Sequence, residues 1–296
     1  MQELVVISGK GGTGKTSIVA SFAVLAQDAI LADCDVDAAD LHLVLKPTIV
    51  QREEFSGGSQ ARILPERCTV CGKCTELCRF EAISRDGPGN GKADKTYRVD
   101  AIACEGCGVC AHFCPENAIE FGPVVNGELF ISGTRCGPMV HARLGVAAEN
   151  SGKLVSLVRT RARQLAEQRR GEFILIDGPP GIGCPVIASL TGASLALVVT
   201  EPTLSGEHDL ERVLGLTRHF NMPAAVCVNK WDLNPSMAER IERKANAAGA
   251  AIAGRVRYDM EVTTAQIQAQ ATVEREGGAA DDIRRLWNDL KDIGDR

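Results

Sequence analysis

The stretch Gly9-Lys10-Gly11-Gly12-Thr13-Gly14-Lys15-Thr16 decides the fold of this 296-residue chain. It follows an apolar run over residues 4–7 that predicts a buried strand, and it precedes an Ala- and Val-rich segment over residues 17–27 with helical spacing. In that context the pattern G-x-x-x-x-G-K-[ST] predicts a phosphate-binding loop. The residues expected to bind nucleotide there are Gly9, Lys10, Gly11, Gly12, Thr13, Gly14, Lys15, Thr16 and Ser17.

Each part of this loop has its own chemical task. Glycines let the backbone curl so that successive N–H groups point at phosphate oxygens, and the helix that follows adds the positive end of its dipole. We expect Lys15 to reach the β- and γ-phosphates and the Thr16 hydroxyl to bind Mg²⁺. Lys15 is therefore a predicted catalytic residue as well as a binding residue.

Acidic residues follow two of the predicted strands. Asp33-Cys34-Asp35-Val36-Asp37 ends one short strand, and Asp177 ends another apolar strand in the pattern of a Walker B motif. Ligands bind at the carboxyl ends of strands in an α/β sheet, and carboxylates beside a triphosphate need Mg²⁺ or a proton between them. We therefore expect Asp177 to bind the Mg²⁺ with Thr16, and at least one acid of the first turn to face the metal or the attacking water. We select Asp35 for this role because of the family resemblance described below. The other acids of the turn have the plain alternative of capping or solvating it.

Eight cysteines form two matching runs in the middle of the chain. The pattern Cys-x2-Cys-x2-Cys-x3-Cys starts at Cys68 and recurs at Cys104. Three closely spaced thiolates bind three irons of one [4Fe–4S] cubane, and the fourth cysteine binds the other cubane. This predicts one cluster on Cys68, Cys71, Cys74 and Cys114 and a second on Cys78, Cys104, Cys107 and Cys110. Structural zinc is the alternative, but zinc sites use paired knuckles rather than runs of three.

Composition sets limits on location and partners. The net charge of −5 argues against non-specific binding of nucleic acid, which needs a basic face. The first predicted strand runs directly into the phosphate-binding loop, so we expect no signal peptide, and we expect no apolar stretch that spans a bilayer. A cytoplasmic location follows as an expectation. In that reducing compartment, 12 cysteines indicate metal rather than disulfides.

The early lysine of the loop, Lys10, resembles the deviant Walker A motif of the MinD/ParA/Mrp ATPases and the nitrogenase iron protein. Over almost its whole length, the chain is similar to the MinD-superfamily ATPases that carry an inserted ferredoxin domain. The stretches at residues 137–142 and 149–155 are typical of that subgroup. The resemblance implies a dimer in which Lys10 crosses to the partner's phosphates, with Asp35 orienting the attacking water and Asn229 contacting adenine. A solvated lysine beside an anionic ligand is the plain alternative for Lys10.

Three further features leave alternatives open. Asn229-Lys230-Trp231-Asp232 also looks like the guanine-reading motif of GTPases, although the superfamily favours ATP. Cys184 lies where the nitrogenase iron protein has a cluster cysteine, but a lone cysteine is usually a buried small hydrophobe. The last helix has an apolar stripe that includes Trp287, and its many acids predict docking on the protein's own core rather than on anionic lipid.

We therefore predict a mostly parallel α/β sheet with helices on both faces and an inserted small α+β ferredoxin-like domain. The ATPase domain is expected at residues 1–59 and 123–296, and the inserted domain at residues 60–122. The expected cofactors are ATP or ADP, Mg²⁺ and two [4Fe–4S] clusters. The expected function couples ATP-driven dimer switching to metal-cluster or metallocofactor assembly. The alternatives are a nucleotide-gated electron carrier and a ParA-like positioning ATPase. A homodimer, a heterodimer with a related ATPase, and a cluster acceptor or redox partner are the expected partners.

Overall fold

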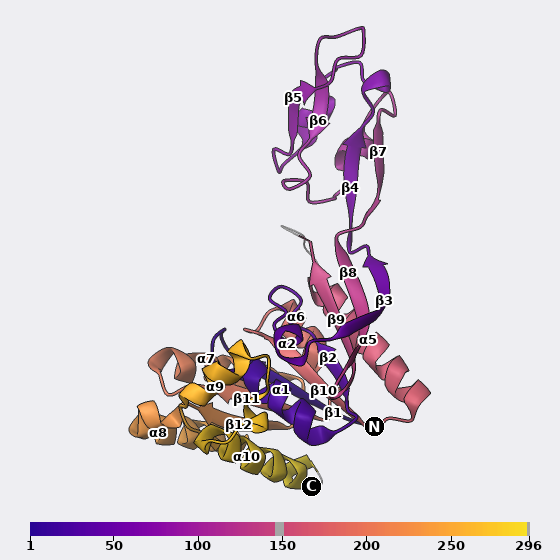
Figure 1. The fold of residues 1–296 in the computed structure, drawn as a ribbon. Helices are drawn as coiled ribbons and strands as arrows, with labels where there is room; N and C mark the ends of the chain where they lie inside the picture. The colour runs from indigo at the N-terminus through magenta and orange to yellow at the C-terminus, as the bar shows by residue number, and fades with distance from the viewer. Residues whose placement is uncertain (146–150, 295–296) are drawn as a thin grey trace. The chain divides into compact units, whose positions relative to one another are not determined.

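Figure 1 shows the fold, a computed structural model that describes residues 1–145 and 151–294. The chain divides into two compact units. The first contains Met1–Glu53, Leu129–Arg143 and the chain from Ser151 onward, and the second contains Glu54–Glu128 with a short segment that starts at Leu144. The second unit interrupts the first in sequence, as the position of the cysteine runs predicts. The prediction that residues 60–122 form a functional module is not tested by this division.

A nine-stranded sheet forms the centre of the first unit, in the order β13-β12-β11-β1-β10-β2-β9-β8-β3. Neighbouring strands from β13 through β9 pair in parallel. This confirms the predicted mostly parallel sheet. The strands are β1 (Gln2–Ser8), β2 (Ile30–Asp33), β3 (Thr48–Phe55), β8 (Gly127–Thr134), β9 (Gly137–Leu144), β10 (Phe173–Pro180), β11 (Leu195–Thr200), β12 (Ala224–Asn229) and β13 (Ala251–Val256).

Helices cover both faces of this sheet (Figure 1). Helices α1 and α10 pack on one face, and α5 to α8 pack on the other. The helices are α1 (Lys15–Ala26), α2 (Leu41–Leu45), α5 (Ser151–Arg169), α6 (Cys184–Leu190), α7 (Leu204–His219), α8 (Pro235–Ala247), α9 (Met260–Ile267) and α10 (Gly278–Gly294), with 3₁₀ turns η2 (Trp231–Leu233) and η3 (Thr272–Glu274).

Strand β1 shows why this sequence is buried on both sides. Leu4 and Val6 belong to the apolar cluster with α1 and α10, and the alternate residues Val5 and Ile7 are fully buried. Because successive side chains of a strand point to opposite faces, a continuous apolar run requires cover on both faces. Trp287 of α10 completes one of these covers, with its ring 5.0 Å from that of Phe22.

The second unit is small and built from paired short elements. Strands β4 (Gly58–Ile63) and β7 (Ile119–Val124) form one antiparallel pair, and β5 (Ile83–Gly87) and β6 (Thr96–Val99) form the other. A 3₁₀ turn, η1 (Pro65–Arg67), and the short helices α3 (Lys73–Leu77) and α4 (Val109–His112) carry the cysteine runs. Four buried side chains, Ile63, Cys68, Ile83 and Ala118, form its core, with further cysteines packed against them. Such a core is small, so bound clusters would contribute much of its stability.

Candidate functional site

The phosphate-binding loop lies at one wall of a cavity of about 560 Å³ at the carboxyl ends of the strands. Residues Gly11 to Ser17 line it, together with Asp35 and Asn229 from the ends of β2 and β12. The opposite wall comes from residues 257–266, the segment that begins α9. Helix α1 starts at Lys15, directly after Gly14 in the left-handed conformation with φ 85°. A side chain on Gly14 would collide with Asn229, whose amide nitrogen lies 2.3 Å from the position of a Cβ.

The floor of this cavity consists of Lys15 and Asp35, which line it, together with Asp33 and Asp177, which are buried next to Lys15. The Lys15 ammonium forms an ion pair with Asp177 and lies 3.7 Å from Asp35. Burial alone would lower the pKa of Lys15, but the neighbouring carboxylates outweigh burial and raise it. Asp33 is fully buried, and burial with the charge of Asp177 raises its pKa well above the usual value. The floor therefore carries more carboxylates than cations.

Several buried polar atoms next to this cavity lack a hydrogen-bond partner among the described residues. They are one carboxylate oxygen each of Asp33 and Asp177, and the hydroxyl of Thr13. Unpaired buried oxygens are costly unless water, metal or ligand satisfies them. Carboxylate and hydroxyl oxygens are also the donors that Mg²⁺ prefers. These residues fit a hydrated Mg²⁺ beside a triphosphate, and the predicted ligands Thr16, Asp35 and Asp177 all lie here.

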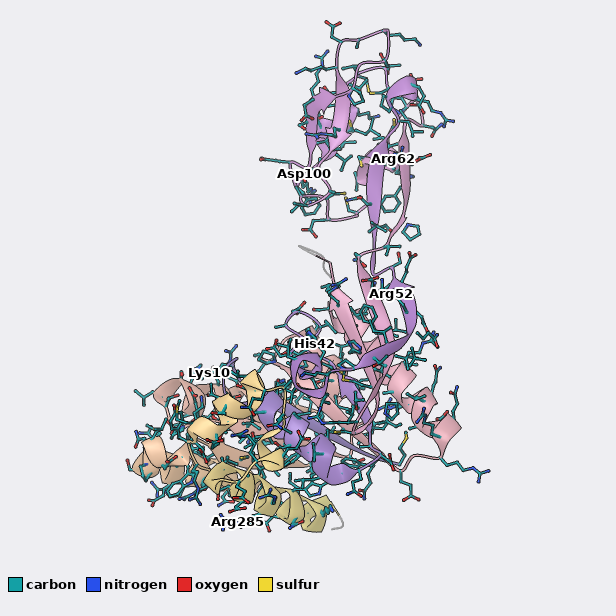
Figure 2. The ribbon with its side chains drawn as sticks, viewed as in Figure 1. Lys10, His42, Arg52, Arg62, Asp100 and Arg285 are labelled. Carbon is teal, nitrogen blue, oxygen red and sulfur yellow. The ribbon has the colours of Figure 1, made fainter. Side chains whose placement is uncertain are left out.

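Lys10 does not line this cavity. Its ammonium lies 2.5 Å from a carboxylate oxygen of Glu201 and 2.8 Å from the Ser205 hydroxyl in the first turn of α7. Figure 2 shows Lys10 on the first unit. The structure therefore separates Lys10 from the lysine that enters the subunit's own phosphate site. Its predicted action on a partner's nucleotide remains a prediction.

Two side chains at the end of β12 donate hydrogen bonds to backbone carbonyls of the phosphate-binding loop. The Asn229 amide donates to the Thr13 carbonyl at 2.7 Å, and the Lys230 ammonium donates to the Gly12 carbonyl at 3.1 Å. The Asn229 carbonyl oxygen accepts the Lys230 N–H at 3.0 Å. Asn229 lines the cavity, and both the nitrogen and the oxygen of its side-chain amide are hydrogen-bonded within the chain. Its predicted contact with adenine stays a prediction.

Asp232 bears on the choice between ATP and GTP. Its carboxylate accepts the Tyr258 N–H at 2.7 Å, and it is not among the residues that line the cavity. A GTPase needs this aspartate free to accept hydrogens from guanine. The preference for ATP, which the superfamily resemblance implies, stays a prediction.

The eight cysteines of the two runs gather around two separate cavities. One is lined by Cys68, Cys71, Cys74 and Cys114, and the other by Cys78, Cys104, Cys107 and Cys110. Each set takes three thiols from one run and one from the other, which is the grouping expected from the spacing. Cys71 and Cys107 are exposed, so each cavity has one thiol at the surface.

Two sets of four thiols are the number of ligands that two cubanes require. Among the described residues, no group of three or more His, Cys, Asp or Glu side chains converges closely enough to hold one metal ion. A zinc site would bring four ligands to one point at about 2.3 Å. A cubane instead takes each thiolate on a different iron and so spreads the sulfurs apart. The cysteine cavities therefore fit two [4Fe–4S] clusters.

Comparisons with known proteins agree with both halves of this description. Residues 48–128 match the family described as 4Fe-4S dicluster domain. A protein of Methanocaldococcus jannaschii, Uncharacterized protein MJ0578, is 32% identical over 79% of this chain and 80% of its own length. MinD of Pyrococcus horikoshii complexed with Mg-ADP aligns with 99% of this chain and 96% of its own, with TM-score 0.57 and 15% identity. The chain belongs to the MinD-type P-loop ATPases that carry an inserted ferredoxin domain.

Other relatives match all or part of this ferredoxin-bearing MinD-type protein. Uncharacterized protein MJ0579, also of M. jannaschii, is 23% identical over 79% of the chain and 83% of its own length. Pyruvate synthase subunit PorD of the same organism is 41% identical over 18% of the chain and 56% of its own length. MinD of Pyrococcus furiosus has a TM-score of 0.56 at 16% identity, covering 99% of each chain. The structural matches establish the fold of the MinD-type protein.

The structure corrects one expectation and confirms another. Cys184 is exposed at the start of α6, so the usual burial of a lone cysteine does not apply to it. In α10, Ile283, Leu286, Trp287 and Leu290 are buried in the core of the first unit, which confirms the predicted docking. None of the described helices combines the length and apolar character that a bilayer crossing requires.

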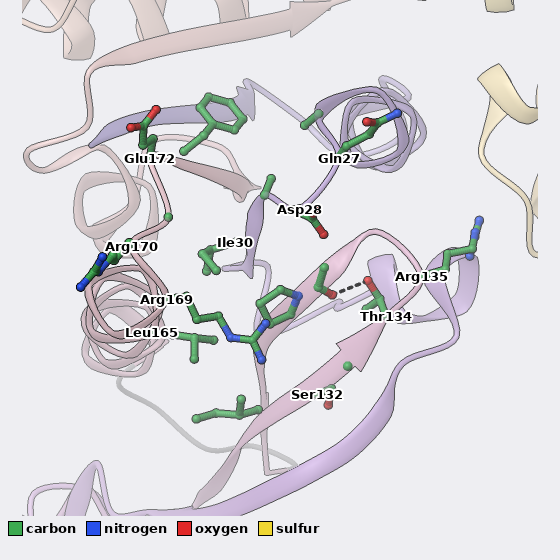
Figure 3. A pocket seen from close by; sticks show the side chains of 18 of the residues that line it. Gln27, Asp28, Ile30, Ser132, Thr134, Arg135, Leu165, Arg169, Arg170 and Glu172 are labelled. Carbon is green, nitrogen blue, oxygen red and sulfur yellow. Dashed lines mark hydrogen bonds between the residues drawn. The ribbon is translucent and has the colours of Figure 1, made fainter.

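A larger cavity of about 950 Å³ lies at the opposite edge of the sheet (Figure 3). It adjoins the amino ends of β2 and β10, and Arg169 extends into it from the end of α5. Ligands of parallel α/β sheets bind at the carboxyl ends of strands, where the phosphate-binding loop lies. Cavity size alone would therefore have selected the wrong edge of the MinD-type domain.

Proposed function

We propose that the chain hydrolyses ATP as a Mg²⁺-dependent dimer and uses this cycle to act on two [4Fe–4S] clusters held by its second unit. One observation carries the proposal: a single chain holds both a phosphate-binding cavity and two four-cysteine cavities. Either two copies of this chain or this chain and a related one form the dimer. M. jannaschii contains two relatives that each match 79% of this chain, which supports a related partner.

The residues of the nucleotide cavity divide the work of hydrolysis. Backbone N–H groups of Gly11 to Thr16 surround the phosphates, and Lys15 neutralises their charge after leaving Asp177. Asp35 orients the attacking water. Thr16, Asp35 and Asp177 hold the Mg²⁺, which supplies charge neutralisation at the phosphoryl group when bound. Lys10 acts from the partner subunit on charge that develops in the transition state.

The first form of the function is assembly or transfer of a metal cluster or metallocofactor. Exchange of a cluster between proteins requires that incoming thiols reach its irons. Cys71 and Cys107 are exposed, one in each set, so an acceptor can approach both clusters. ATP binding and hydrolysis would alternate the dimer between states that retain and release a cluster.

Electron transfer is the second form, and a specific observation favours it. The cysteine region of the chain is similar to pyruvate synthase subunits named PorD, including one from Thermotoga maritima at 38% identity over 20% of the chain. Each four-cysteine set is also drawn from both runs, an interlocked arrangement that favours retention of the clusters. In this form the clusters stay in place and pass electrons to a partner.

One experiment separates the two forms. Anaerobic protein loaded with ⁵⁵Fe clusters is mixed with an apo-ferredoxin, with and without ATP, and Lys15→Ala protein is the control. ATP-dependent movement of ⁵⁵Fe supports assembly. Retained ⁵⁵Fe supports electron transfer if protein that was reduced with dithionite, and then freed of excess dithionite, passes electrons to an added viologen only with ATP. If both readouts are the same with ATP, without ATP and in Lys15→Ala, the proposed coupling is wrong.

A further inference from the structure

Glu201 connects two lysines on either side of the phosphate-binding loop. It follows β11, where one of its oxygens lies 2.5 Å from the Lys10 ammonium and the other lies 3.5 Å from the Lys230 ammonium. Its side chain is 17% exposed, and those of the two lysines are 31% and 30% exposed. Burial would raise the pKa of Glu201, but the two lysines outweigh burial and lower it. The carboxylate is therefore charged and paired twice.

Lys230 is held in place independently of Lys10. Its backbone adopts the left-handed conformation with φ 55° and ψ 33°, which a residue with a side chain rarely adopts. Its ammonium donates to the Gly12 carbonyl at 3.1 Å, and its N–H donates to the Asn229 side chain. These contacts keep the Lys230 ammonium beside Glu201 and the phosphate-binding loop.

The second cation changes the cost of releasing Lys10. If Glu201 had Lys10 as its sole partner, departure of Lys10 would leave a poorly solvated carboxylate unpaired, which is strongly unfavourable. With Lys230 in place, the carboxylate keeps a partner and the loop keeps a positive charge. Lys10 also has a second contact to give up, the Ser205 hydroxyl at 2.8 Å. Two contacts therefore position Lys10 in the free subunit, and Lys230 lowers the free-energy cost of breaking them.

We propose that Glu201 is the positioning residue for Lys10: it holds the lysine against α7 in the free subunit, and Lys230 keeps Glu201 paired when Lys10 moves to the phosphates of a partner subunit. The inference rests on the proposed action of Lys10 across the dimer interface. It adds a residue pair, Glu201 and Lys230, that sets how readily the nucleotide-bound dimer forms.

A double-mutant cycle on the full chain tests this. Dimer formation is measured by sedimentation with Mg²⁺ and a non-hydrolysable ATP analogue for the wild type, Glu201→Gln, Lys10→Ala and the double variant. Glu201→Gln should tighten association about two- to fivefold, the range for a partly exposed ion pair, because Lys10 no longer has to leave a carboxylate. In the Lys10→Ala background the same change should have no effect. The gain should also shrink at high salt.

Glu242→Gln is the matched control. Glu242 pairs with Arg255 at 2.6 Å, and the exposed fractions of that pair, 17% and 31%, equal those of Glu201 and Lys10. It should leave association unchanged. The inference is overturned if Glu201→Gln does not change association, or changes it equally with and without Lys10. If Lys10→Ala alone leaves association and hydrolysis unaltered, the proposed role of Lys10 fails as well, so the two failures are distinguishable.

Discussion

Four ionisable side chains at the floor of the nucleotide cavity affect the stability of the protein when no ligand is bound. Lys15 pairs with Asp177, while Asp33 and Asp35 lie close by in surroundings that disfavour their charge. Such a site is electrostatically unsatisfied until Mg²⁺ and phosphate arrive, because the three carboxylates have one lysine between them. The residues that bind ligand therefore reduce the stability of the empty protein.

Asp35 makes this cost measurable. Burial raises its pKa to about 6, against about 3.9 in an unfolded chain. The folded protein thus binds the proton more tightly, so ionised Asp35 lowers the free energy of unfolding above about pH 6, and this penalty disappears as pH falls towards 4. Asp35→Asn should raise the free energy of unfolding of the nucleotide-free protein by about 1–3 kcal/mol near neutral pH and by little near pH 4.

Urea denaturation at a series of pH values provides the measurement. Asp289→Asn is the control, because Asp289 is exposed on α10 and is not among the charges that shift the pKa of Asp35. A gain from Asp35→Asn of the same size at both ends of the pH range would show that the amide improves packing and that ionisation of Asp35 is not the cause.

We expect the two lysines of the loop to have different roles, Lys15 in ATP binding and Lys10 in hydrolysis. Lys15→Ala should bind ATP poorly, whereas Lys10→Ala should bind it nearly normally and hydrolyse it about 100-fold more slowly, because its charge acts on the transition state. A mixture of the two variants tests the direction of action. A mixed dimer joins an intact Lys10 to one intact loop, so activity should partly return. Mixed dimers that form without regaining activity would place Lys10's action within its own subunit, or nowhere in catalysis.

The sequence predicts the site residues that belong to recognisable motifs. It does not predict residues whose role depends on contacts with side chains far away in the sequence. Lys15, Thr16, Asp35 and Asp177 come from segments with a recognisable pattern, and the structure brings them together. Glu201 follows a strand as an ordinary turn residue, and its two lysine partners lie 191 and 29 positions away. No local pattern records such contacts. For Lys230, a signal was present in the N-K-x-D stretch, but the stretch was interpreted as base recognition.

At the scale of elements, the second unit interrupts a pair of neighbouring strands. β3 and β8 are adjacent in the sheet, and the Asn126 N–H donates to the Phe55 carbonyl at 2.9 Å. The end of β3 therefore lies beside the start of β8, which makes the two strands antiparallel. The insertion occupies the place of a hairpin turn. The chain returns to the main sheet at β8, because the preceding strand β7 pairs with β4 of the second unit.

This arrangement predicts that the insertion can be replaced. A variant in which an Asn-Gly turn replaces residues 56–125 restores a two-residue hairpin between Phe55 and Asn126. It should fold and bind a fluorescent ATP analogue with an affinity close to that of the full chain, and it should bind no iron. Lys15→Ala in the shortened chain is the control and should abolish binding. Loss of nucleotide binding from a folded shortened chain would contradict the proposed division into two domains.

At the scale of the whole molecule, we expect that a substitution in the cysteine sets removes a cluster without weakening ATP binding. Cys71→Ala removes one thiol of the first set and should abolish one cluster, while ATP affinity stays near that of the wild type because other segments bind the phosphates. Iron analysis and ATP binding on the same sample measure this. Cys184→Ala is the control, since Cys184 is an exposed cysteine outside both sets, and it should retain both clusters. Simultaneous loss of clusters and ATP binding in Cys71→Ala would show that the two units fold only together.

The central claim is that one MinD-type chain carries two [4Fe–4S] clusters in addition to its nucleotide site. Iron and acid-labile sulfide, measured per chain after anaerobic reconstitution, test it most directly. Eight cysteines in two sets predict about eight irons and about eight sulfides per chain, with EPR signals of reduced [4Fe–4S] clusters after dithionite treatment. About four irons, or zinc in place of iron, would contradict the account.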